Sequence, residues 1–187
     1  MFEIAKADFD SGISEHLAEH DRENLIDLYS ERREELPQLN RYSYILCIIA
    51  FSEYKLHQFA EGTSALKNTS IKLSDINGRG IRRTRIFLEK VIGINVNNIK
   101  EWDFIASLTT VRNFIAHNYG LLNSDDEKRK KVEQFFQNNP EFGSIKNSKI
   151  AFSDQFITTS SKIINSFFKS LYTEFETWVS SDQDLQA

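Results

Sequence analysis

The stretch FITTSSKIINSFFKSLYTEFETW, Phe156 to Trp178, decides the fold class of this chain. Its apolar residues recur three or four positions apart, which places them on one side of an α-helix. They are Phe156, Ile163, Ile164, Phe167, Phe168, Leu171, Phe175 and Trp178. Ser153 and Asp154 precede the stretch and are typical of a helix N-terminus. We expect a long amphipathic helix whose aromatic stripe packs in the core or against a partner.

The same spacing predicts helices over much of the remaining chain. The predicted ranges are about 14–33, 38–60, 80–92, 99–118 and 124–136. We expect Pro37 to break the chain between the first two helices, and Glu61 to Gly80 to form a long connection. The segment GSIKNSKIAFS, residues 143–153, fits either a short hairpin or a loop. Together these elements predict an all-α fold, an up-and-down bundle of about five to six helices in a single domain over residues 1–187.

Composition narrows the class of protein further. The 187 residues carry a net charge of −4, which argues against a general polyanion-binding protein. Only one cysteine is present, Cys47, and the N-terminus lacks the pattern of a secretion signal. The longest apolar run, Tyr44 to Phe51, is far shorter than the roughly 20 residues of a membrane span. We therefore expect a cytoplasmic protein with no membrane insertion, and we interpret the basic run Lys128 to Lys131 as a solvated helix face.

One segment combines a helix end with polar residues of chemical interest, VRNFIAHNYGLL, Val111 to Leu122. Arg112 and His117 are five residues apart, so an ideal helix separates them by about 140° and about 7.5 Å along its axis. Asn113 and His117 share a face. The spacing alone allows a plain helix end, with His117 favoured by the helix dipole, or a site that becomes tighter when two copies meet across a two-fold axis.

Such a site suits cleavage of RNA without a metal ion. His117 has the chemistry to take a proton from a ribose 2′-hydroxyl or to give one to the leaving 5′-oxygen. Arg112 offers forked donors to the phosphate, and Asn113 is placed to orient the base or the phosphate. The other histidines include only one pair with a metal-like spacing, His16 and His20, without a supporting motif. We therefore expect no metal site and no cofactor.

The chain resembles the HEPN superfamily of helical RNA-cleaving toxins and defence effectors. The resemblance rests on RNFIAHN, Arg112 to Asn118, which fits that family's Arg-x4–6-His motif with its frequent Asn after Arg. It also rests on the order of AFSEYKL, GRGIRRTRIFLEKVIGIN, a Trp-containing helix and then the motif followed by Tyr-Gly. The similarity spans about Gln38 to Leu122. A final amphipathic helix follows, as it often does in that family.

The resemblance implies a homodimeric, metal-independent endoribonuclease, with Arg112, His117 and Asn113 at a composite site and tRNA as the first substrate to consider. It implies a role in toxin-antitoxin systems, abortive infection or antiviral defence, with an antitoxin or a defence-complex protein as partner. Tyr119 matches a tyrosine that nucleotidyltransferase antitoxins modify in some of these toxins, although this chain is longer than those toxins. Two alternatives stay open: a catalytically silent HEPN module that binds RNA or nucleotides or serves as a defence-complex subunit, and a plain helical dimerisation protein.

Several charged residues have a possible supporting role. Glu53 lies on the apolar side of its predicted helix, so it is expected to pair with a cation. It either pairs with Arg112 or positions His117, or it pairs with any other arginine, for example one from the 80–92 helix. Arg79, Arg82 and Arg83 crowd the start of that helix, where the helix dipole disfavours positive charge. An RNA phosphate or an acidic antitoxin surface would explain this placement, as would a solvated face balanced by nearby acidic residues.

Overall fold

A computed structural model describes the backbone of residues 19–122 and 127–181, with side chains from residue 35 onward in those ranges. The chain divides into two compact units, residues 1–40 and 41–187. The side chains discussed below belong to the second unit, apart from Pro37. The expectation of a single domain over residues 1–187 stays a prediction.

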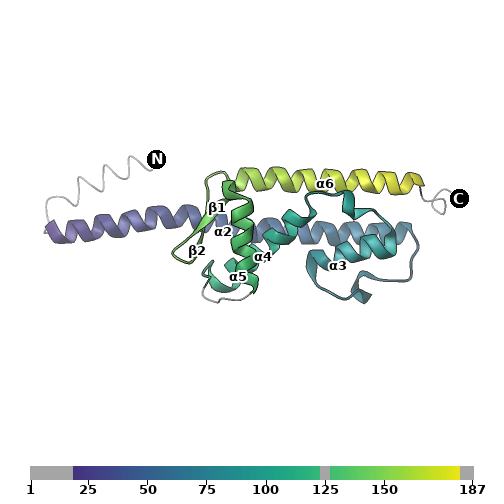
Figure 1. The fold of residues 1–187 in the computed structure, drawn as a ribbon, viewed down its shortest axis with the longest axis horizontal. Coiled ribbons are helices and arrows are strands. Elements are labelled where there is room, and N and C mark those ends of the chain that lie inside the picture. The colour runs from purple at the N-terminus through teal and green to yellow at the C-terminus, as the bar shows by residue number, and fades with distance from the viewer. Residues whose placement is uncertain (1–18, 123–126, 182–187) are drawn as a thin grey trace. The chain divides into compact units, whose positions relative to one another are not determined.

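The described residues form α-helices joined by short turns and one hairpin (Figure 1). The helices are α2 (Glu19–Leu66), α3 (Gly80–Phe87), α4 (Trp102–Asn118), α5 (Glu127–Asn138) and α6 (Phe156–Ser181). The hairpin consists of β1 (Gly143–Lys146) and β2 (Lys149–Phe152), and 3₁₀ turns cover Leu73–Asp75, Val96–Asn98 and Pro140–Phe142. A π-helical turn, Leu88–Ile92, extends α3 to the end predicted for that helix. The mostly helical class is confirmed, and residues 143–153 form the hairpin rather than a loop.

The predicted break at Pro37 is wrong, because α2 continues through this residue. The fixed φ of proline is compatible with a helix, so its insertion costs one helical hydrogen bond and some steric strain without requiring a break. The predicted end near Ala60 is also wrong, since α2 reaches Leu66. Ala60 and Thr63 are both buried, and their packing holds these turns in place despite Gly62. The predicted helix starts at residues 14 and 124 lie outside the described residues.

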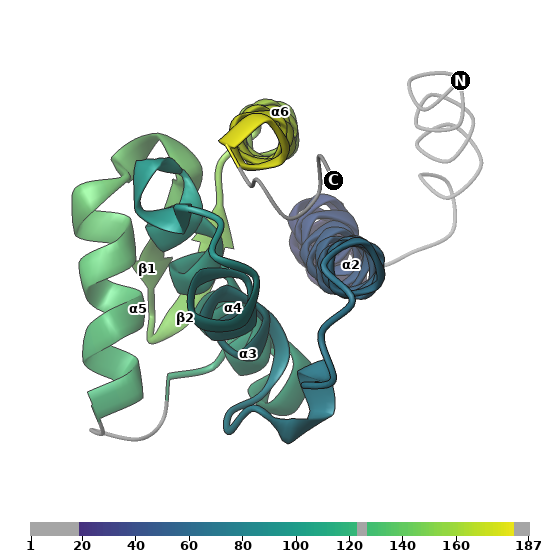
Figure 2. The same ribbon diagram turned by 90° about the vertical axis from the view of Figure 1, so that its right-hand side faces the viewer.

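Helix α4 supplies much of the core of the second unit. Its buried side chains are Trp102, Ile105, Leu108, Val111, Phe114 and Ile115. Figure 2 shows α4 with α2 and α6 on one side and α5 and the hairpin on the other. Trp102 packs against Phe167 of α6, with ring centroids 5.0 Å apart. Of the two predicted alternatives, core or partner, the structure shows the core for most of the stripe, since Phe156, Phe167 and Trp178 are buried within this chain. Phe168 and Phe175 are only partly buried.

The end of α4 is fastened to the hairpin by backbone hydrogen bonds. The two strands pair antiparallel from Gly143 opposite Phe152 to Lys146 opposite Lys149. The amide of Leu122 donates to the carbonyl of Ser148 at 2.8 Å, and the amide of Ile150 donates to that of Gly120 at 3.0 Å. The C-terminal end of the segment Val111 to Leu122 is therefore hydrogen-bonded to the hairpin. Among the described residues, none of the helices is both long and apolar enough to cross a membrane.

Candidate functional site

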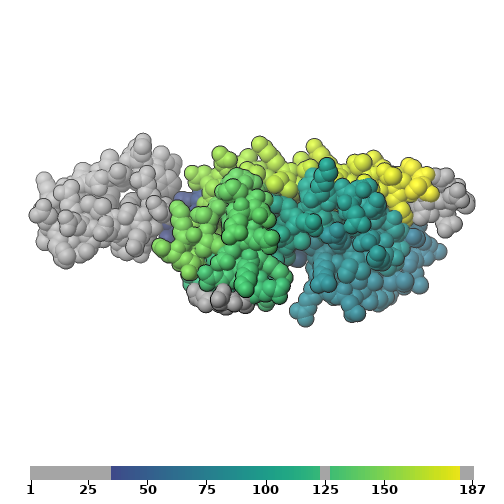
Figure 3. Space-filling view, viewed as in Figure 1, coloured from purple at the N-terminus to yellow at the C-terminus, as the bar shows by residue number. Residues whose placement is uncertain are grey.

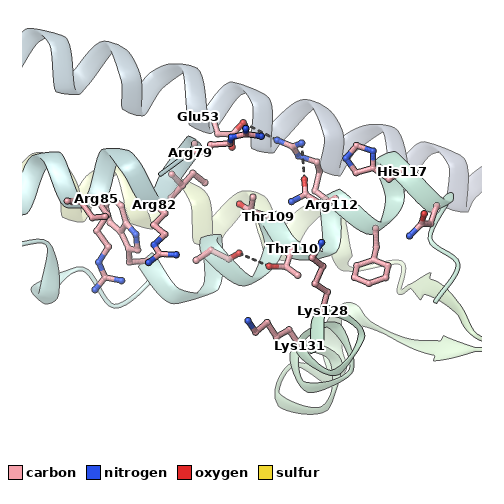
Figure 4. A pocket seen from close by; sticks show the side chains of 18 of the residues that line it. Glu53, Arg79, Arg82, Arg85, Thr109, Thr110, Arg112, His117, Lys128 and Lys131 are labelled. Atoms are coloured by element: carbon pink, nitrogen blue, oxygen red, sulfur yellow. Dashed lines mark hydrogen bonds and ion pairs between the residues drawn. The ribbon is translucent and has the colours of Figure 1, made fainter. Parts of the chain in front are cut away.

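A cleft of about 1230 Å³ opens between α3, α4 and α5 and reaches Glu53 of α2 (Figure 4). In the space-filling view the surface is notched between α5 and the α3 region (Figure 3). Six cationic side chains line the cleft, against two carboxylates. The six are Arg79, Arg82, Arg85, Arg112, Lys128 and Lys131. The chain as a whole has a net charge of −4, whereas the side chains that line this cleft carry an excess of positive charge.

Arg112 of α4 is held in the cleft wall by two side chains. Its Nη2 donates to Oε2 of Glu53 at 3.0 Å, and its Nη1 donates to Oδ1 of Asn113 at 3.1 Å. The Nε atom is buried and has no hydrogen-bond partner among the described residues. The Arg112 and Glu53 side chains are only 23% and 29% exposed, so the ion pair is partly shielded from water. The guanidinium is therefore fixed in direction and keeps spare donor hydrogens for an anion.

Glu53 reaches Arg112 because Gly80 leaves room for it. A Cβ atom at position 80 would lie 2.6 Å from Oε1 of Glu53, which is closer than real Cβ contacts. Gly80 also has a positive φ of 52°, which glycine adopts without strain. Of the two cations that the sequence left open for Glu53, an arginine of the 80–92 helix or Arg112, the structure pairs it with Arg112.

His117 and Asn113 lie on the same cleft as Arg112. Figure 4 places the His117 ring further along α4 than Arg112, on the same rim. His117 is exposed and makes no hydrogen bond or ion pair with the described residues, so its ring nitrogens are free to meet a ligand. Although the ideal helix directs Arg112 and His117 apart, the long Arg112 side chain brings both groups to one cleft in a single copy. A contribution from a second copy stays a prediction.

The helix end that follows is shaped by two tyrosines and a glycine. Tyr119 adopts a left-handed conformation with φ 53°, is 48% exposed and does not line the cleft. Its ring meets Tyr42 edge to face at 5.8 Å, and Nζ of Lys149 lies 4.4 Å from its centroid. Tyr42 donates to the carbonyl of Ile150 at 2.5 Å, and burial, with a smaller effect of Tyr119, raises the pKa of Tyr42 to about 12. Gly120 is needed here, because a Cβ would lie 2.6 Å from the Tyr42 hydroxyl. Modification of Tyr119 stays a prediction.

The three arginines at the start of α3 separate into two groups. Arg79 and Arg82 line the cleft, and their side chains make no ion pair or hydrogen bond with the described residues. Arg83 does not line it, and its Nε donates to the carbonyl of Gly78 at 2.8 Å. The structure therefore brings Arg79 and Arg82 into the cleft of Arg112 and leaves Arg83 outside.

Sequence reasoning missed part of the cleft wall. Lys128 and Lys131 of α5 are exposed, as predicted for a solvated face, and they also line the cleft, which the sequence did not predict. Their separation of three residues was the available signal, since it places them on one side of a helix. Arg85 also lines the cleft, where it contacts Asp103 and Asn97 at 3.3 Å each. Its guanidinium lies 5.6 Å from the Trp102 ring centroid.

No protein-family model matches this chain, and comparisons with curated proteins and with solved structures found no relative. Within the described ranges, no group of three or more His, Cys, Asp or Glu side chains is arranged to hold a metal ion. Function has to be argued from the cleft itself.

Proposed function

We propose that this chain is a metal-independent endoribonuclease of the HEPN type, a toxin or antiviral defence effector that cleaves cellular RNA. The observation that carries the proposal is the cleft that gathers Arg112, Asn113 and His117 with further unpaired cations. The excess of cationic side chains in the cleft favours a polyanionic ligand there. The motif resemblance of residues 112–118 selects RNA among polyanions.

The chemistry follows from the groups in the cleft. The ribose 2′-oxygen attacks the adjacent phosphorus, the bond from phosphorus to the 5′-oxygen breaks, and a 2′,3′-cyclic phosphate and a 5′-hydroxyl result. One proton leaves the 2′-hydroxyl and one reaches the departing 5′-oxygen. His117 performs one of these transfers, while Arg112 donates hydrogen bonds to the phosphate oxygens as their negative charge increases. Asn113 fixes the Arg112 guanidinium through the 3.1 Å hydrogen bond.

A homodimer is part of the proposal, because the cleft of one copy holds one histidine. A single imidazole cannot take one proton and supply another in the same concerted step. His117 of a second copy would supply the other transfer across a two-fold axis. Sedimentation velocity tests this part: we expect a dimer at the concentration of the cleavage assay, and a monomer that still cleaves RNA would remove the second copy from the mechanism.

Cleavage of total RNA in EDTA tests the activity. We expect the full chain to cut RNA and His117→Ala to lose about 10²- to 10⁴-fold in rate, as is typical when a general acid or base is removed. His117 is exposed, so its substitution should leave folding unchanged. His57→Ala is the matched control, since His57 is also exposed but lies outside the cleft.

Arg112→Lys provides a second variant that retains the positive charge. Lysine lacks the forked donors, so we expect the rate to fall although the charge persists. Arg83→Lys, outside the cleft, should cleave like the unmodified chain. If the unmodified chain binds RNA tightly but leaves it intact, the result would favour the catalytically silent RNA-binding module over the enzyme. Cleavage unaffected by His117→Ala would refute the assigned site.

A further inference from the structure

The cleft extends well beyond Arg112 and His117. Figure 4 shows Arg82 of α3 and Lys131 of α5 on the side away from His117, with Lys128 of α5 below Arg112 in this view. Thr110 of α4 also lines this part of the cleft. The volume of about 1230 Å³ exceeds the roughly 300–1,000 Å³ that suits a drug-sized ligand. A single nucleotide at the motif would leave this part of the cleft empty.

The cations in this part of the cleft are weakly neutralised. Arg82 and Lys128 make no ion pair or hydrogen bond with the described residues. Lys131 pairs with Glu127 at 3.1 Å, but both side chains are more than half exposed, and such pairs contribute little. Arg85, by contrast, already contacts Asp103 and Asn97. The positive charge of the first three residues is therefore available to a ligand.

The direction of the α5 side chains separates cleft residues from their neighbours. Lys128 and Lys131 line the cleft, while the intervening Lys130 is exposed and does not. Arg129 is also directed elsewhere, since it donates to Glu133 and to the carbonyl of Leu122. Two lysines of the run thus face the arginine of α3 across the floor formed by α4.

We propose that Arg82, Lys128 and Lys131 form a second phosphate subsite that holds the RNA backbone next to the cleaved bond. This inference rests on the proposed function, and it makes the substrate a stretch of several nucleotides rather than a dinucleotide. Lysine binds phosphate as a point charge, and phosphate contacts position a strand without reading its sequence. The subsite therefore adds affinity and register, and it adds no base preference.

The test measures binding separately from cleavage. Fluorescence anisotropy in EDTA would use 2′-O-methyl RNA strands of two to about ten nucleotides, which lack the attacking hydroxyl and stay intact. We expect the affinity of the unmodified chain to rise with strand length. The double variant Lys128→Ala and Lys131→Ala should bind the longer strands about tenfold or more weakly and bind the dinucleotide with unchanged affinity. The slope of log K against log salt should fall by about 0.7 for each phosphate contact that is lost.

Lys130→Ala is the matched control for Lys128→Ala, because it removes the same charge from the same helix outside the cleft. An equal loss in both variants, or affinity that does not depend on strand length, would overturn the subsite. Binding that follows the expectation while natural RNA stays uncut would retain the subsite and refute the proposed function. If natural RNA is cut but the lysine variants weaken the binding of short and long strands equally, the subsite is refuted and the proposed function is not.

Discussion

Substitution of Gly80 by alanine should disturb the cleft without changing any charged group. The new Cβ would lie 2.6 Å from Oε1 of Glu53, so the carboxylate has to move. That carboxylate is held by Arg112 at 3.0 Å in a partly buried ion pair. Gly80→Ala is therefore expected to act on Arg112 through Glu53, although position 80 and Arg112 are on different helices.

The expected cost has two contributions. An alanine at the φ of 52° found for Gly80 adopts a left-handed conformation, at a cost of about 1–2 kcal/mol. Loss of the Glu53 hydrogen bond to a charged, partly buried Arg112 adds about 1–3 kcal/mol. The free energy of unfolding should thus fall by about 2–5 kcal/mol. In a Glu53→Ala background, Gly80→Ala should cost only the backbone contribution.

Urea unfolding of four proteins tests this reasoning: the unmodified chain, Gly80→Ala, Glu53→Ala and the double variant. We expect a coupling free energy of about 1–3 kcal/mol between the two positions. An identical cost of Gly80→Ala in both backgrounds would show that the glycine acts through its own backbone only. Gly62→Ala is the control, because Gly62 lies within α2 with no atom near its missing Cβ. It should stabilise the chain by about 0.5–1 kcal/mol.

Three other perturbations have expected outcomes. Because the pKa of Tyr42 is raised from 10.0 to about 12, its contribution to stability should stay constant below pH 10 and decrease by about 2 kcal/mol as pH rises from 10 to 12. Urea unfolding measures this decrease, and Tyr42→Phe should abolish it. The hydrogen bond from Ser166 lowers the pKa of Glu101 below 4.5, so the stability that Glu101 contributes is present above pH 4.5 and is lost as pH decreases. In Ser166→Ala this loss of stability at low pH should be smaller, as measured by acid unfolding followed by circular dichroism. Phe167 is fully buried, and Phe167→Ala should lower the free energy of unfolding by about 3–5 kcal/mol, whereas a loss below 1 kcal/mol would contradict its place in the core.

Helical periodicity predicted the fold where apolar residues recur without interruption. The helices predicted over residues 99–118 and from residue 156 are both observed, and each buries an apolar side. The boundaries set by single residues were less predictable. Pro37 and Gly62 lie inside α2, because a proline or glycine disfavours a helix by a few kcal/mol at most and the flanking turns outweigh that cost.

Local sequence could predict only part of the candidate site. The spacing of Arg112, Asn113 and His117 was sufficient to group them on one helix end. The spacing did not decide whether Glu53 pairs with Arg112 or with an arginine of α3, since both lie far from it along the chain. The lysines of α5 were missed because their sequence neighbours, Asp125, Asp126 and Glu127, made the run look locally neutral. Neighbours in sequence say little about which side of a helix meets a cleft.

The position of positive charge in one cleft of an acidic chain has a kinetic consequence. Six cationic side chains against two carboxylates attract a polyanion that comes near the cleft. The attraction acts before contact and favours approaches in which the polyanion meets the cleft. The association rate should therefore decrease steeply with ionic strength. Dissociation, once the strand is seated against Arg112, should respond to salt much less.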